Sequence, residues 1–101
     1  MLRGYGNGPE RPRGVSVGGI VISKRGRDKG GAFVIVGTDG DYLYLADGKL
    51  RKLEKPKKKK LMHVQITESM SEETAAKLSA GSLQDADLRK VLLRFGNNGE
   101  V

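Results

Sequence analysis

The chain lacks cysteine and tryptophan and contains a single histidine, His63. Without cysteine it has no disulfides, no thiolate metal ligands and no cysteine nucleophile, which favours a reducing compartment. A single histidine excludes a histidine-rich metal site and leaves only one residue to serve as the base of a catalytic triad. We therefore expect no catalytic residues, no metal site and no cofactor.

Long apolar runs are also missing. No segment approaches the ~18 consecutive apolar residues of a membrane span, and the first residues have no apolar core like that of a secretory signal. These patterns predict a cytoplasmic protein without membrane contact. Aromatic residues make up only 5% of the 101 residues, so valine, isoleucine and leucine must supply the core of one small domain. A core of this size leaves little room for a large internal ligand pocket.

Positive charge is concentrated in two short segments of the chain. The net charge is +7, whereas residues 18–29 alone carry +3 and residues 49–60 carry +7, so the remainder is mildly acidic. Such asymmetry favours a polyanion as the partner over a surface charged only for solubility. The basic side chains of the two segments are Lys24, Arg25, Arg27, Lys29, Lys49, Arg51, Lys52, Lys55, Lys57, Lys58, Lys59 and Lys60.

The apolar pattern between these charges predicts a mainly β fold. Asp39-Gly40 and Asp47-Gly48 are Asp-Gly pairs of the kind that close tight turns, with positive φ at the glycine. Five short runs with β character suggest a small barrel. The expected strands are Gly19 to Lys24, Ala32 to Gly37, Asp41 to Ala46, Lys49 to Leu53 and Leu61 to Ile66.

Tyrosine and leucine alternate in the third of these runs. Tyr42 and Tyr44 should therefore lie on one side of the strand, with Leu43 and Leu45 buried on the other. The two tyrosines either stack exposed bases or pack against neighbouring side chains with their hydroxyls at the rim, and packing is the favoured interpretation.

The pattern becomes helical after residue 66. Ser71 supplies an N-cap, Gly81 a stop, and a second helix from Asp85 or Ala86 to Phe95 should end at Gly96. This second helix has an apolar stripe that should cover the barrel. We thus expect a flexible basic arm at 1–15, a barrel at 16–66, a helical extension at 67–96 and a disordered tail at 97–101.

The segment GIVISKRGRDKGGAFVIVG, residues 19–37, resembles the KOW motif of ribosomal and transcription-elongation proteins. In that motif a glycine forms a tight turn just after an acidic–basic pair, and here Asp28, Lys29 and Gly30 take those places. The glycines would let the backbone approach a phosphate while the basic side chains neutralise it. The alternative is a basic hairpin loop without function in another SH3-like barrel.

The second basic segment, DGKLRKLEKPKKKKLMHVQ, strengthens the resemblance. After Pro56 four consecutive lysines form a block of like charge, which we expect to be mobile until a polyanion orders it. A solvated linker is the alternative interpretation. With residues 22–28 and 41–46, this segment is similar to small bacterial KOW-domain RNA-binding proteins related to a large-subunit ribosomal protein of archaea and eukaryotes, the fourteen-e class. The similarity covers residues 17–65 strongly and the helical tail more weakly, and it does not extend to the N-terminal arm.

The resemblance implies an SH3-like barrel that binds structured RNA, ribosomal RNA above all, and has no enzymatic activity. Ribosomal proteins are further expected partners, and the free protein should be a monomer. The alternative function is a protein-interaction KOW module associated with the transcription or translation machinery. The residues expected to contact RNA are the twelve basic side chains named above together with Gly30. Lysine predominates among them, which suits attraction to phosphates more than the reading of base edges.

Overall fold

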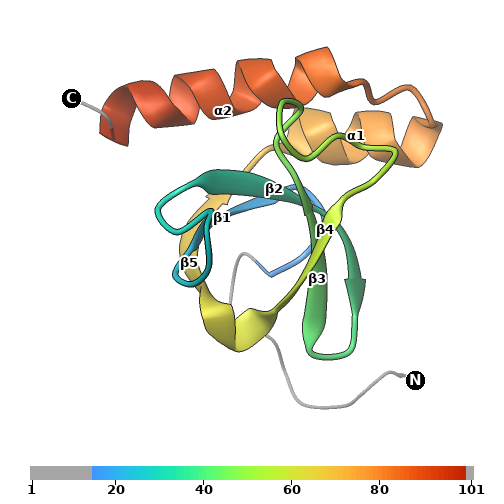
Figure 1. Cartoon of the computed structure of the whole chain (residues 1–101). Coiled ribbons are helices and arrows are strands. Elements are labelled where there is room, and N and C mark those ends of the chain that lie inside the picture. The colour runs from blue at the N-terminus through green and yellow to red at the C-terminus, as the bar shows by residue number, and fades with distance from the viewer. Residues whose placement is uncertain (1–14, 100–101) are drawn as a thin grey trace.

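The computed structural model of the chain describes residues 15–99. In this part of the chain five strands form one antiparallel sheet, in the order β4-β3-β2-β1-β5, and two helices follow it. The sheet curls into a half-barrel, with both helices lying together on one side of it (Figure 1). The mainly β class with two C-terminal helices is therefore confirmed. The strands are β1 Gly19–Ser23, β2 Ala32–Asp39, β3 Tyr42–Ala46, β4 Lys57–Lys60 and β5 Val64–Met70.

The expected fourth strand, Lys49 to Leu53, is wrong, because these residues form a loop between β3 and β4. Asp47 Oδ1 accepts hydrogen bonds from the backbone N–H of Lys49 and of Arg51, each at 2.9 Å. The N–H of Leu53 donates to Asp85 Oδ1 at 2.8 Å. Carboxylates thus bind the alternate N–H groups that a strand would offer to its neighbour. The fourth strand is instead the lysine run, which pairs with β3.

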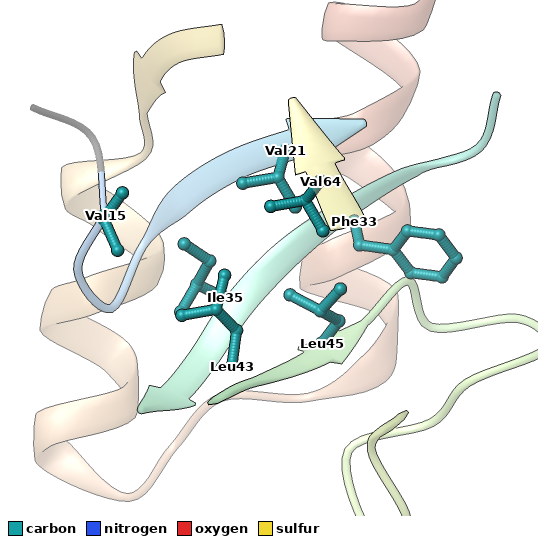
Figure 2. Close-up of a cluster of buried hydrophobic side chains, with 7 residues drawn as sticks. All are labelled: Val15, Val21, Phe33, Ile35, Leu43, Leu45 and Val64. Carbon is teal, nitrogen blue, oxygen red and sulfur yellow. The ribbon is translucent and has the colours of Figure 1, made fainter. Parts of the chain in front are cut away.

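One hydrophobic cluster fills the inside of the curled sheet. Leu43 and Leu45 are fully buried there, whereas Tyr42 and Tyr44 are half-buried on the opposite face, so the predicted alternation is confirmed. The core also reaches one residue into the predicted arm, since Val15 is buried; the rest of that arm lies outside the described residues. The buried members of this cluster, shown in Figure 2, are Val15, Val21, Phe33, Ile35, Leu43, Leu45 and Val64.

A second cluster lies between the outer face of the sheet and helix α2, Asp85–Gly99. The predicted apolar stripe of this helix packs there, and Leu88 is fully buried against β1, β2 and β3. The start of α2 also lies close to the β3–β4 loop. A Cβ on Gly48, whose φ is 80°, would collide with the carbonyl oxygen of Asp85. Glycine is therefore required at this contact by both its conformation and its lack of a side chain.

Helix α1, Glu72–Ala80, has the cap and the stop that the sequence predicts, but residues 67–70 of the expected helical extension belong to β5. Ser71 Oγ accepts a hydrogen bond from the N–H of Thr74 at 3.1 Å, and Gly81 adopts the left-handed conformation. The predicted stop at Gly96 is wrong, since α2 continues to Gly99. Glycine permits a left-handed stop without enforcing one. Residues 97–99 of the expected disordered tail are thus helical, and the last two residues lie outside the described part.

Candidate nucleic-acid interface

The loop between β1 and β2 carries the first basic segment on the surface. Its cations Lys24, Arg25, Arg27 and Lys29 are all exposed. Backbone hydrogen bonds close the base of the loop, because the N–H of Ser23 donates to the Gly31 carbonyl at 2.9 Å and the N–H of Gly30 donates to the Ser23 carbonyl at 2.8 Å. Gly30 is itself exposed, with a φ of 90°. Four cations are thus presented on a short loop with a hydrogen-bonded base.

The one acidic residue of this loop, Asp28, points back toward β4. Its side chain is only 14% exposed, and its two carboxylate oxygens have different lysine partners. Lys57 Nζ lies 2.8 Å from Oδ2 as an ion-pair partner, without the alignment of a hydrogen bond. Lys59 Nζ donates to Oδ1 at 3.2 Å and to the carbonyl oxygen of Arg25 at 2.9 Å. Asp28 therefore joins the two basic segments across about thirty residues of sequence.

Strand alternation divides the lysine run into two pairs. Lys57 and Lys59 turn toward Asp28, and Lys59 is only 7% exposed, whereas Lys58 and Lys60 are exposed on the opposite face of β4. The expectation that this block of like charge stays mobile until a polyanion orders it is therefore wrong, because the run forms β4. Asp28 offsets part of the charge of Lys57 and Lys59, which lets the run pair with β3 as a strand. Only the other pair is free to meet an external anion.

The surroundings of Asp28 hold its pKa well below the ordinary value for an aspartate. Burial opposes ionisation and is the largest single influence, but the contacts with Lys57, Ser23 and Lys59 together outweigh it. Ser23 Oγ lies 2.9 Å from Asp28 Oδ1 and 2.9 Å from the carbonyl oxygen of Arg25, so its single proton is shared between two acceptors. The carboxylate is consequently charged throughout the physiological pH range.

The low pKa of Asp28 makes the stability of the protein depend on acid. The pKa of Asp28 in the unfolded chain is ~3.9, so below this pH the unfolded chain binds a proton at Asp28 while the folded chain still does not. The stabilisation by ionised Asp28 is therefore present above that pH and is lost as the pH falls. The difference in free energy of unfolding between the wild type and Asp28→Asn should therefore shrink between about pH 5 and pH 2. Urea unfolding of both proteins measures it. Parallel pH profiles would contradict a role for this carboxylate.

Two tyrosines share the outer face of β3 and β4 with the exposed lysines. In the register of the two strands Tyr42 lies opposite Lys60, and Tyr44 lies opposite Lys58. Lys58 Nζ is 4.6 Å from the ring centroid of Tyr42 and 6.0 Å from that of Tyr44. These distances are within the reach of a cation–π attraction. The sequence prediction that the tyrosines pack against neighbouring side chains thus holds for Tyr42, with a lysine as the neighbour.

His63 lies beside the point where the basic segments meet. It ends the short helix η1, Leu61–His63, so its predicted position in a strand is wrong, and its carbonyl accepts a hydrogen bond from the N–H of Lys24 at 2.9 Å. Desolvation and then the surrounding positive charges lower the pKa of His63. Those charges belong to Arg25, Lys59, Lys60 and Lys24. The imidazole is therefore a natural reporter of the positive potential at this surface.

The remaining candidate residues are not brought to the same place. Lys49, Arg51, Lys52 and Lys55 are exposed on the β3–β4 loop, which lies against the start of α2. The guanidinium of Arg89 donates to the carbonyl oxygen of Gly48 at 2.7 Å and so helps to hold this loop to the helix. The thirteen candidates therefore fall into one convergent group around the β1–β2 loop and β4 and a separate group beside α2.

Asp28 is the organising residue that sequence reasoning did not identify. Its role in a turn was expected, but its pairing with lysines of β4 was not. The available signal was a lone acidic residue among four cations, in a loop between two predicted strands. Within residues 15–99, no three histidine, aspartate or glutamate side chains gather in a way that could hold a metal ion.

The chain was compared with known proteins. No protein-family model and no curated protein matches it. None of the helices in the described part of the chain has the length and apolar character needed to cross a membrane.

Proposed function

We propose that this protein binds structured RNA, ribosomal RNA above all, through the convergent basic surface of the β1–β2 loop and β4. The fold in this proposal is an SH3-like barrel of the KOW type. Support comes from the strand order β4-β3-β2-β1-β5, in which the first strand pairs with both the second and the last to curl the sheet. The proposal assigns a binding role and no catalytic residue.

One observation carries the proposal: two basic segments far apart in the sequence meet where the β1–β2 loop lies beside β4. The hydrogen bond from Lys59 to the carbonyl of Arg25 and the ion pairs of Asp28 hold the loop beside β4. Within residues 15–99 no acidic side chain forms an ion pair with the cations that remain exposed, so an external polyanion is the partner that relieves their mutual repulsion. These cations are Lys24, Arg25, Arg27, Lys29, Lys58 and Lys60.

The arrangement favours recognition of the RNA backbone over the reading of base edges. Lysine ammonium groups act as point charges toward phosphate, and no described helix bears a row of cations suited to a groove. Helix α2 has only three basic residues, Arg89, Lys90 and Arg94, on its exposed side. An RNA with two closely approaching phosphate strands, such as a helix next to a turn, fits such a compact surface best.

The number of exposed cations predicts the salt dependence of binding. If all six contact phosphates, each contact releases condensed counterions, and the logarithm of the affinity should fall against the logarithm of salt concentration with a slope of roughly −4 to −5. A filter-binding series with a fragment of ribosomal RNA, from low to moderate salt, measures this slope. The same series with a purely neutral polymer of similar size is the control. Affinity that does not change with salt would overturn the proposed function.

A further inference from the structure

An open hollow adjoins the tyrosine and lysine face of β3 and β4. Its volume is about 400 Å³, which lies within the range of small-molecule sites. One wall comes from the sheet and from the end of the β3–β4 loop, and the other comes from the end of α1 and the connection to α2. The lining residues are Val36, Gly37, Tyr44, Leu53, Pro56, Leu78, Gly81 and Leu83.

Gly37 keeps the hollow open next to Tyr44. The two residues are opposite each other in the register of β2 and β3, where the pairing is irregular. A Cβ at Gly37 would lie 3.3 Å from Tyr44 Cδ2, which is tight enough to force the ring to move. Gly37 does not have a positive φ, so its backbone conformation does not require glycine. The missing side chain therefore matters for space, as it does in strands that a ligand approaches closely.

Tyr44 combines an apolar surround with a nearby cation. Its ring lines the hollow with Leu53, Pro56 and Leu83, while Lys58 Nζ lies 6.0 Å from the ring centroid. Tyr42 differs, because Lys58 is only 4.6 Å from its centroid and it does not line the hollow. An aromatic ring beside an apolar recess, with a cation 6.0 Å from the ring centroid, matches the chemistry of a nucleotide whose base is unstacked and whose phosphate is charged.

We infer that the hollow receives a single unpaired base of the bound RNA, stacked on Tyr44, with the phosphate of that nucleotide on Lys58. This inference rests on the proposed function and adds a preference for RNA helices that carry a bulged or looped-out nucleotide. The charge of Lys58 near the Tyr44 ring favours this occupant over an apolar protein segment, which would gain nothing from that charge. Backbone contacts provide affinity, and the hollow provides selectivity among RNA shapes.

The test compares two RNA probes and two matched variants. The probes are a short RNA duplex and the same duplex with one unpaired nucleotide, and the variants are Tyr44→Leu and the control Tyr42→Leu. The wild type should bind the bulged RNA more tightly than the duplex. Loss of one base–aromatic stack should weaken binding of the bulged RNA roughly 5- to 100-fold in Tyr44→Leu, while duplex binding changes less than about twofold. Tyr42→Leu should leave the preference intact.

A second measurement uses only the wild-type protein. In NMR spectra, the methyl groups of Leu78 and Leu83 should shift when the bulged RNA is added and not when the duplex is added, because a base in the hollow has a ring current. Unmoved methyl groups, or equal loss of both RNAs in Tyr44→Leu, would overturn the inference and leave the hollow as a candidate protein contact. Failure of both RNAs to bind the wild type at low salt would instead overturn the proposed function itself.

Discussion

Reversing the charge of Lys58 and Lys60 together should weaken RNA binding about 100- to 1,000-fold at moderate salt without unfolding the protein. Each lysine that contacts a phosphate contributes through counterion release, and a glutamate in its place adds repulsion to that loss. Both side chains are exposed and make no ion pair with an acidic residue of residues 15–99. The melting temperature of Lys58→Glu/Lys60→Glu should therefore remain close to that of the wild type, as circular dichroism can show.

The control is a second double variant with the same change in net charge. Lys49→Glu/Lys52→Glu alters two exposed lysines of the β3–β4 loop, which lies beside α2 and away from the convergent surface. Its loss of affinity should be smaller than about tenfold, because only the long-range field changes and salt screens that field. Equal losses in the two variants would mean that net charge alone governs binding. If Lys58→Glu/Lys60→Glu lost RNA but still associated with ribosomes or polymerase, a protein-interaction role would be favoured.

Lys59→Met should destabilise the protein although it removes a lysine from a run of four. The free energy of unfolding should fall by about 2 to 4 kcal/mol. This is less than the full cost of breaking a buried ion pair, because Lys57 still pairs with Asp28 in the variant. For a domain of this size that loss lowers the melting temperature by roughly 10 to 30 °C. The physical reason is that Asp28 and the carbonyl of Arg25 lose a buried donor while remaining largely shielded from water. Thermal or urea unfolding at neutral pH measures the effect.

Two further variants make this prediction specific. Lys60→Met changes an adjacent but exposed lysine and should alter stability by no more than about 0.5 kcal/mol. Adding Asp28→Asn to Lys59→Met should cost little more than Lys59→Met alone, because asparagine leaves no unpaired negative charge at this shielded position. Two outcomes would contradict the role of Asp28 in joining the β1–β2 loop to β4. One is strict additivity of the two substitutions in this double-mutant cycle, and the other is a Lys59→Met protein as stable as the wild type.

Local signals in the sequence predicted those elements whose causes are local. Ser71 and Gly81 bound α1, because a cap depends on only a few neighbouring residues. The alternation of tyrosine and leucine predicted the two faces of β3 for the same reason. The apolar stripe that ends at Phe95 predicted that α2 packs on the sheet, since no other apolar surface was offered by the sequence.

The lysine strand could not be predicted, because its cause is distant in the sequence. Four consecutive lysines have no apolar alternation, and only the approach of Asp28, 31 residues before Lys59, gives the run two different faces. The error at residues 49–53 has a similar origin, because Asp85 binds the N–H of Leu53 from 32 residues away. The candidate interface was therefore predicted in composition but not in geometry. The sequence did not separate the lysines that hold the fold from those that are exposed.

The position of the lysine run at the end of the strand order has a consequence for solubility. β4 is an edge of the sheet, and a strand at an edge offers unpaired backbone groups to a strand of another molecule. A second copy that docked there side by side would bring several ammonium groups together, and their repulsion would oppose that pairing. The lysines that we propose to contact RNA should thus also protect this edge against aggregation. Apolar replacements of Lys58 and Lys60 should accordingly promote aggregation, whereas glutamate replacements should not.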